Sequence, residues 1–382
     1  MSEVTLREQL DVKARSAKTR RLDLSFNEIS SLYRDGELEI SPSFQRIFVW
    51  TPLKRSQFIE SLLLELPIPP IYVVEEDEGK YILVDGLQRI SSYLHFRGQL
   101  ENPSKGIQSG DFLKLEGCDI ADEINGKVWN DLDTALQIKV KRAFVSVQVI
   151  RRESEPALRY HMFKRLNDGG TPVSPQQVRN CIIRMFDRGD EVMNFFAEMS
   201  KKPSFAEVVT DILTQSKVSD QFDEELVIRF FALKNQLDEF THHVGEFLTG
   251  YVEGLVGVEG EPDSFEFLRE EQVFEKTFKI LQASTGSSSV TFPNKTRDKL
   301  TTGFSAYTYE AVTVGLQTHL AKLDHTDTEQ MQGLGKCLEA ARLSEAFIAD
   351  TTGGGKNSAG PMRNRINVIE NAVANFLGHD AS

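Results

Sequence analysis

The segment 81–92, with the sequence YILVDGLQRISS, constrains the fold of this chain most strongly. An apolar run ends at Asp85 and Gly86, and an amphipathic stretch follows, which predicts a strand, a tight turn and a helix. The first turn of a helix presents backbone N–H groups and a partial positive charge, so such a turn can bind an anion. Arg89 adds a planar guanidinium that suits phosphate. We therefore expect Asp85 and Arg89 to act on a phosphorylated ligand, with Asp85 holding a metal ion, a water or a ribose hydroxyl.

A simpler interpretation of the same turn stays open. Asp85 can cap the helix and Arg89 can form a surface ion pair, since both arrangements are common in proteins. The turn alone does not decide between a ligand site and an ordinary helix start.

A second cluster lies upstream, where SFQRIFVW at 43–50 runs into Thr51 and Pro52. Thr51 is a good N-cap, and proline is favoured at the first helical position. The apolar spacing predicts a helix that packs on a core and stops at Pro67, with the stripe Ile59, Leu62, Leu63 and Leu66. The runs 71–76 and 81–85 then predict a hairpin that turns at Glu78 and Gly79.

Three ordered segments carry a family resemblance: QRIFVW with FIESLLLELPIPPIYVVE, then VDGLQRISS, then MFKRLNDGGTPVSPQQVRNC at 162–181. Together they resemble the N-terminal domain of GmrSD-type restriction enzymes, which has the ParB/sulfiredoxin-like fold. The family usually reads D-G-Q-Q-R followed by Leu-Thr or Phe-Thr. Here Leu87 replaces the first Gln and Ser91 stands for Thr, while Gln177 stands where an acidic residue is common. The resemblance extends over roughly residues 20–185.

The resemblance implies a nucleoside-triphosphate hydrolase of a prokaryotic or phage-related restriction or anti-phage defence system, acting with a divalent cation, with Mg expected. Asp85 and Arg89 would be the catalytic residues. The substrate-binding residues would be Gln45, Arg46, Gly86, Gln88, Ser91, Asn167 and Arg179. The alternative is a module without turnover that senses nucleotide or DNA and controls a separately encoded nuclease or toxin. Proteins of this family often carry an HNH-type nuclease module, and the sequence shows no such His-centred motif.

The third segment also predicts structure by itself. Asn167 and the following glycines are typical of a helix end, and Ser174 with Pro175 is typical of the next helix start. If this loop folds against the Asp85 turn, Asn167 and Arg179 add an amide and a second cation that suit a polyphosphate. Plain helix capping by Asn167 remains the alternative.

Composition sets outer limits. The 382 residues suffice for two domains, expected at 1–185 and 186–382, and 40% hydrophobic with 26% charged residues is ordinary for a globular protein. No apolar run approaches the ~20 residues of a membrane span, and the charged N-terminus is no secretory signal, so we expect a cytoplasmic protein without a membrane partner. The three cysteines, Cys118, Cys181 and Cys337, show no metal or disulfide spacing.

Charge argues against a whole-surface interaction with DNA, because the formal net charge is −13. Two local basic stretches remain, KARSAKTRR near the N-terminus and IKVKRAFVSVQVIRR at 138–152, and we expect the second to be a strand with solvated cations. TTGGGKNS at 351–358 fails the Walker A spacing, although the nearby Arg363 and Arg365 could contact a nucleotide or nucleic acid.

Beyond residue 185 the apolar spacing is helical almost throughout, with GSSSVTFPNK and 351–360 as the main loops. Many of the 25 Phe residues fall on these helices, which indicates core packing. The overall expectation is an α+β protein: a ParB/sulfiredoxin-like small mixed sheet with helices, followed by a mainly α-helical domain. Because amphipathic helices expose apolar stripes that need covering, this half is a candidate surface for a homo-oligomer or another subunit.

Overall fold

The computed structural model describes residues 18–40, 48, 50–76, 79–102, 105–154, 162, 165, 174–184, 186–258, 260–294, 296 and 298–379. The chain divides into two compact units: Met1–Val173 with Asn180–Met185, and Ser174–Arg179 with Phe186–Ser382. The division falls inside helix α8 (Pro175–Ile183).

The first unit contains a five-stranded mixed sheet with the strand order β1-β5-β3-β4-β2. The strands are β1 (Thr19–Ser25), β2 (Leu38–Glu39), β3 (Ile71–Glu75), β4 (Tyr81–Asp85) and β5 (Phe144–Ile150). The pairs β1–β5 and β3–β4 are antiparallel, whereas β3–β5 and β2–β4 are parallel. The predicted hairpin is confirmed, since Val74 pairs with Ile82 and Glu75 with Tyr81.

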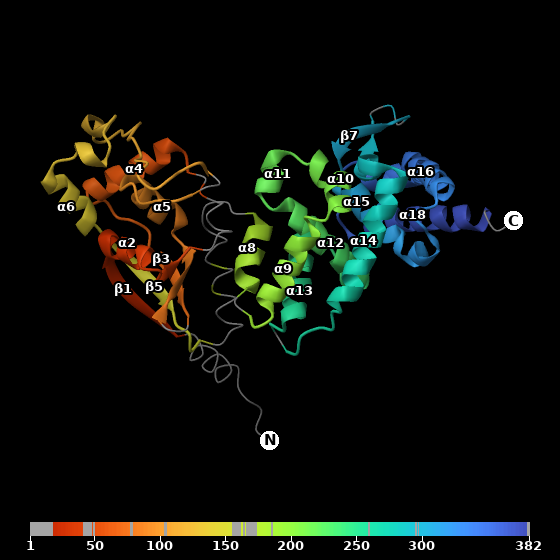
Figure 1. Ribbon diagram of the computed structural model, residues 1–382, viewed down its shortest axis with the longest axis horizontal. Helices are drawn as coiled ribbons and strands as arrows, with labels where there is room; N and C mark the ends of the chain where they lie inside the picture. The colour runs from red at the N-terminus through yellow and green to blue at the C-terminus, as the bar shows by residue number, and fades with distance from the viewer. Residues whose placement is uncertain are drawn as a thin grey trace, which may run out of the picture. The chain divides into compact units, whose positions relative to one another are not determined.

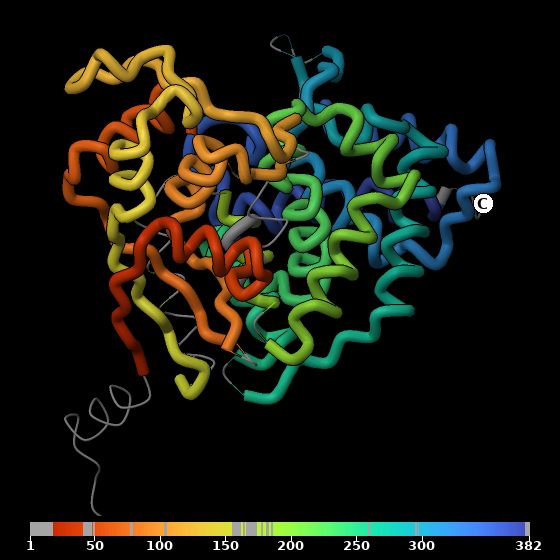
Figure 2. The backbone as a smooth tube through the Cα atoms, turned by 60° about the vertical axis from the view of Figure 1, so that its left-hand side comes forward, coloured from red at the N-terminus to blue at the C-terminus, as the bar shows by residue number. Residues whose placement is uncertain are grey.

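In the described part of this unit, α-helices lie beside the sheet (Figures 1 and 2). They are α2 (Phe26–Arg34), α4 (Pro52–Leu63), α5 (Leu87–Phe96) and α6 (Thr134–Arg142), accompanied by the 3-10 turns η3 (Asp122–Ile124) and η4 (Trp129–Asp131). Apolar side chains of β1, β3 and β5 meet Ile29 and Leu32 of α2 and Ile90 of α5. Because successive strand residues point to opposite faces, the alternating Leu22, Leu24 and Val147, Val149 line this one core.

Helix α4 starts as predicted, because the Thr51 side chain accepts the Lys54 N–H at 3.3 Å and Pro52 occupies the first turn. Its end differs from the prediction. Glu65 adopts a positive φ of 57°, the Leu66 N–H bonds to the Ser61 carbonyl, and the helix closes at Leu63. Leu66 is therefore outside the buried stripe and 38% exposed.

The prediction of one strand through 138–152 is wrong for its first part. Residues 134–142 form α6, and the Asp133 side chain caps that helix by accepting the Leu136 N–H at 2.9 Å. Lys and Arg are good helix formers, so the cap and the propensity outweigh the short apolar alternation of Ile138 and Val140. The second part is the predicted strand, β5.

The second unit is mainly helical, as expected. Its α-helices are α8, α9 (Gly189–Met199), α10 (Pro203–Val208), α11 (Gln215–Ser219), α12 (Phe222–Gln236), α13 (Val244–Val256), α14 (Phe267–Ser284), α15 (Ala306–Gly315), α16 (Thr328–Leu343), α17 (Glu345–Thr351) and α18 (Ala359–His379). Shorter 3-10 segments are η5 (Thr210–Ile212), η6 (Leu237–Glu239), η7 (Gly286–Val290) and η8 (Gln317–Lys322). Phenylalanines form its core: the Phe231 ring lies 5.0 to 5.9 Å from those of Phe195, Phe196, Phe230, Phe265 and Phe274.

The stretch GSSSVTFPNK is not simply the expected loop. Thr291–Pro293 forms β6, which pairs antiparallel with β7 (Leu300–Phe304). The segment that joins α17 to α18 contains the glycine-rich stretch at 353–355, in agreement with the expected loop. In the part of the chain that the structure describes, no helix is both long and apolar enough to cross a bilayer.

We expect Gly86→Ala to lower the free energy of unfolding by about 2–4 kcal/mol. Gly86 has φ of 114°, and an added Cβ would lie 2.8 Å from the Ile71 side chain, so strain and a clash act together. Gly79→Ala is the matched control, because Gly79 has φ of 78° with open space around it, and it should cost only about 1–2 kcal/mol. Urea unfolding of both variants measures the difference, and equal costs would contradict the close approach at Gly86.

Candidate functional site

The Asp85 turn connects β4 to α5, as the sequence predicts. Gly86 is the N-cap of α5, and its positive φ reverses the chain without a side-chain cap. Asp85 instead accepts the Gly86 N–H with Oδ1 at 2.7 Å and a guanidinium hydrogen bond from Arg89 with Oδ2 at 2.8 Å. Both carboxylate oxygens are therefore fixed in direction, while about a third of the Asp85 side chain, 35%, stays exposed.

Arg89 lies inside the domain, and its ion pair is with the partly exposed Asp85. Its side chain is 10% exposed, and its Nη1 donates to the Pro69 carbonyl at 3.1 Å. One guanidinium thus connects the segment before β3, the end of β4 and the first turn of α5. Of the two residues, Asp85 is the one that a ligand can reach without rearrangement.

Gln88 brings the upstream cluster to this turn. Its Oε1 accepts the Trp50 N–H at 3.1 Å, and the residue is 7% exposed. Arg55 of α4 donates from Nε to the Trp50 carbonyl at 2.8 Å and covers the Phe48 ring at 4.1 Å. Trp50, at the end of the first motif, is therefore joined to Gln88 of the second motif by a hydrogen bond.

His95 of α5 contacts Arg55, the same side chain that donates to Trp50. Arg55 Nη1 lies 3.3 Å from His95 Nδ1, and because a guanidinium can only donate, Nδ1 is the acceptor of a neutral imidazole. Burial, followed by the charge of Arg55, lowers the pKa of His95 to about 4, against a smaller opposing effect of Asp111. Burial also lowers the pKa of Arg55. The pair is a neutral ring beside a partly desolvated cation.

Neither Arg55 nor His95 was singled out from the sequence, although both lie in recognisable patterns. Arg55 opens the apolar stripe of α4 at the position three before Phe58 and four before Ile59. His95 continues the spacing of Gln88 and Ser92 along one face of α5. A polar residue on such a stripe is the signal that would have identified them.

The comparison with family models decides what this domain is. The model for the GmrSD restriction endonuclease, N-terminal domain, matches residues 27–184. This part of the chain is a GmrSD N-terminal domain. No curated protein and no solved structure matches the chain. The match supports a component of a restriction or defence system, and most of the second unit lies beyond it.

Within the GmrSD N-terminal domain, the remaining predicted residues differ in position. Ser91 is 3% exposed and lies in α5, so its hydroxyl is below the surface of the turn. Leu87, the departure from the family motif, is 8% exposed. Gln45, Arg46 and Asn167 lie outside the described residues.

Arg179 belongs to the second unit by its contacts. Its guanidinium donates to Gln176, to Thr249 Oγ1 at 3.2 Å and to the Gly245 carbonyl at 3.4 Å. Burial lowers the pKa of Arg179 to about 10, with the charge of Glu225 opposing the shift. The predicted role of Arg179 at a phosphate stays a prediction, and these acceptors already engage its side chain.

The predicted divalent cation has one candidate ligand here. Among the described residues, no group of three or more His, Cys, Asp or Glu could hold a metal ion. Mg²⁺ is often bound by one or two carboxylates together with substrate phosphates and water, so Asp85 with a bound polyphosphate fits such a site. A cation without nucleotide does not fit it, since Arg89 and Gly86 already contact both oxygens.

We expect the domain to lose stability as the pH falls from about 6.5 to about 4. The folded pKa of His95 is about 4 and the unfolded value is about 6.5, so in this window the unfolded chain binds the extra proton. The free energy of unfolding should drop by about 1–2 kcal/mol, because the ring is partly exposed and solvent screening reduces the effect.

Chemical unfolding at pH 4.5 and pH 7.0 tests this. His95→Gln keeps an acceptor for Arg55 and removes the titration, so its pH dependence should be flatter by that amount. His242→Gln, which removes an exposed imidazole, is the matched control and should keep the slope of the parent. A parent-like slope in His95→Gln would show that the buried ring does not titrate in this window.

We expect Leu87→Gln to lower the free energy of unfolding by about 1–3 kcal/mol, because a buried amide would lack full hydrogen bonding. Leu53→Gln, at a position that is 44% exposed, should change it by no more than about 0.5 kcal/mol. Thermal melts of both variants give the comparison. An unchanged melt for Leu87→Gln, together with tighter nucleotide binding, would instead show that position 87 faces the ligand.

Proposed function

We propose that the GmrSD N-terminal domain binds a nucleoside triphosphate at the Asp85 turn and hydrolyses a phosphoanhydride, as the nucleotide-handling part of a restriction or anti-phage defence system. The hydrogen bond from Trp50 to Gln88 carries this proposal, because it joins the 43–50 motif to the D-G-x-Q-R turn. The bond supports the proposal because it brings Trp50, at the end of the first motif, to the first turn of α5.

Each described residue then has a role. Asp85 presents the exposed carboxylate, which would orient the attacking water or contact a cation bound by the phosphates. Arg89 holds that carboxylate in place through its 2.8 Å contact. Gln88 and Arg55 hold the backbone of Trp50. Gln45 and Arg46, which lie outside the described residues, are the proposed phosphate contacts. A bound Mg²⁺ would neutralise phosphate charge.

A second function has an observation in its favour. Arg89 is committed to Asp85 and to the Pro69 carbonyl, so among the described residues at the turn it is not free to bind phosphate. This favours a module that senses nucleotide or DNA without turnover and controls a separately encoded nuclease or toxin. The hydrolase would release phosphate or pyrophosphate, whereas the sensing module would bind its ligand without forming a product.

We expect Asp85→Asn to reduce phosphate release from the preferred triphosphate at least 100-fold, or about 3 kcal/mol in the barrier, with Mg²⁺ present. The substitution keeps the size and one acceptor oxygen of the side chain, so binding should weaken less than turnover. Asp23→Asn is the control, because Asp23 also pairs with an arginine, Arg21, at 3.3 Å but on an exposed strand. It should behave as the parent.

The assay follows phosphate and pyrophosphate with each of the four ribonucleoside triphosphates, and binding is measured in parallel by calorimetry. Saturable binding without product in the parent would select the sensing function. Full turnover in Asp85→Asn with every triphosphate that the parent uses would place the reactive site elsewhere.

A further inference from the structure

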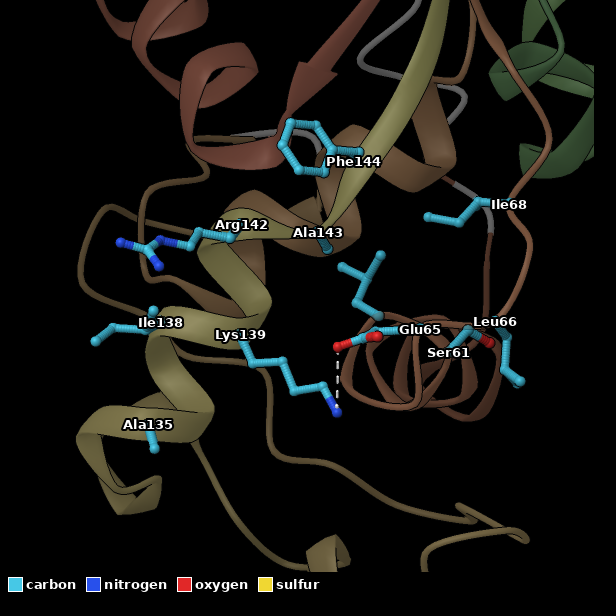
Figure 3. A pocket seen from close by; sticks show the side chains of 11 residues that line it. Ser61, Glu65, Leu66, Ile68, Ala135, Ile138, Lys139, Arg142, Ala143 and Phe144 are labelled. Atoms are coloured by element: carbon cyan, nitrogen blue, oxygen red, sulfur yellow. Dashed lines mark ion pairs between the residues drawn. The ribbon is translucent and has the colours of Figure 1, made fainter.

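A groove that none of the predicted site residues lines lies on the first unit, between the end of α4, helix α6 and the start of β5 (Figure 3). Its volume is about 560 Å³. The walls are mostly aliphatic, with Leu62, Leu66 and Ile68 on one side and Ala135, Ile138, Ala143 and Phe144 on the other.

Exposed apolar side chains are concentrated at this groove. Phe144 is 68% exposed, Ile138 is 40% exposed and Leu66 is 38% exposed, and the neighbouring Leu64 is 36% exposed. Elsewhere in the described chain the large exposed apolar residues are Leu53, Ile120, Leu268 and Phe292. Single exposed apolar residues need no explanation, whereas a contiguous group beside a hollow is typical of a binding surface.

The rim of the groove is positively charged in an acidic chain. Lys139 reaches across to Glu65 at 3.4 Å, as Figure 3 shows, and so one cation is already paired. Arg142, which also lines the groove, lies one turn further on α6 and forms no ion pair with any described residue. Lys139 and Arg142 are in the last turn of α6, where the helix dipole favours positive charge.

The second unit offers a segment of complementary character. Residues 260–268, with the sequence GEPDSFEFL, lead into α14 and carry the exposed acids Glu261, Asp263 and Glu266. Leu268, in the first turn of α14, is 77% exposed. Glu261 and Glu266 form no ion pair within the described chain. The segment therefore has an exposed apolar side chain, Leu268, beside unpaired acids. The groove has apolar walls beside the unpaired cation of Arg142, so the two surfaces are complementary in apolar character and in charge.

We propose that the groove of one chain binds the acidic 260–268 segment of a second copy, with Leu268 inserted against Phe144 and Ile138 and the acids facing Arg142. The interface is heterologous, because two different surfaces meet, so association continues with concentration unless two copies close a ring. The aliphatic walls and the carboxylate of Glu65 favour a protein segment over nucleic acid, whose phosphates Glu65 would repel.

Sedimentation and light scattering of the full chain from 1 to 100 µM measure the assembly. The average mass should rise with concentration, and Phe144→Ser or Leu268→Ser should each shift the half-association point upward at least tenfold. Phe292→Ser, on the exposed hairpin strand β6, is the control and should leave it unchanged. Circular dichroism melts check that each surface variant is folded.

Mixing the Phe144→Ser and Leu268→Ser variants is a more specific test of the proposed contact. Phe144→Ser keeps the anchor but lacks a working groove, and Leu268→Ser keeps the groove but lacks the anchor. At the concentration where the parent is half associated, each alone should therefore be monomeric. An equal mixture restores one complete contact and should yield a species of twice the mass of one chain, without larger assemblies. A mixture that stays monomeric overturns the proposal.

Charge-reversal variants test which charged side chains face each other in the proposed interface. Arg142→Glu and Glu266→Arg should each weaken association about fivefold, and the two changes in one chain should recover most of the loss, with both effects reduced in 0.5 M salt. Three results would each overturn the proposal: a parent that is monomeric at 100 µM, association that Phe144→Ser leaves intact, or charge reversals whose effects simply add.

Discussion

The backbone of Trp50 is held by two hydrogen bonds, and the arrangement of the candidate site depends on them. Gln88 of α5 accepts its N–H, and Arg55 of α4 donates to its carbonyl. A buried polar group without a partner costs about 1–3 kcal/mol, so these bonds favour one position of Trp50. The same guanidinium covers Phe48 and reaches His95. Two helices and two motifs thereby form one hydrogen-bonded assembly.

Helix α4 takes part in both surfaces of the first unit. Its first turns carry Arg55, which supports the Asp85 turn, and its C-terminal end is followed by Glu65, which lines the groove. The turn is closed by internal contacts, since Arg89 bonds to Asp85 and Pro69, whereas the groove exposes Phe144 and an unpaired Arg142. We therefore propose nucleotide binding and hydrolysis near the first turns of α4, and self-association of the chain near its C-terminal end.

Buried charge also organises the second unit. Glu310 of α15 bonds to Arg229 of α12 and to Arg365 of α18, and Glu225 pairs with Arg229 at 2.9 Å. Such a network gives little net stability, but removing one member costs about 3–5 kcal/mol because the remaining charge stays buried. Arg365, a candidate nucleotide contact from the sequence, is therefore an internal residue, and Arg363 pairs with Asp238.

Local signals in the sequence determined much of this protein. Thr51 with Pro52, the β-branched runs at 71–75 and 81–85, and Gly86 specify the α4–β3–β4–α5 order, because caps, strand propensity and a positive φ act within a few residues. The three motif segments also pointed to the GmrSD N-terminal domain. Periodicity misjudged residues 138–142 and the extent of α4, where a capping bond and the backbone of Glu65 outweigh the apolar spacing.

Tertiary structure alone decided which polar residues face inward. The sequence predicts that Arg89 and Gln88 contact a ligand. In the structure, Arg89 donates to the carbonyl of Pro69, 20 positions away, and Gln88 accepts the N–H of Trp50, 38 positions away. The pairing of Arg55 with His95 and the groove beside Phe144 likewise depend on elements that are distant in the chain. The sequence by itself determined the family of the N-terminal domain and the order α4–β3–β4–α5. The fold decided the partners, because hydrogen bonding and burial depend on three-dimensional proximity that spacing along one chain does not encode.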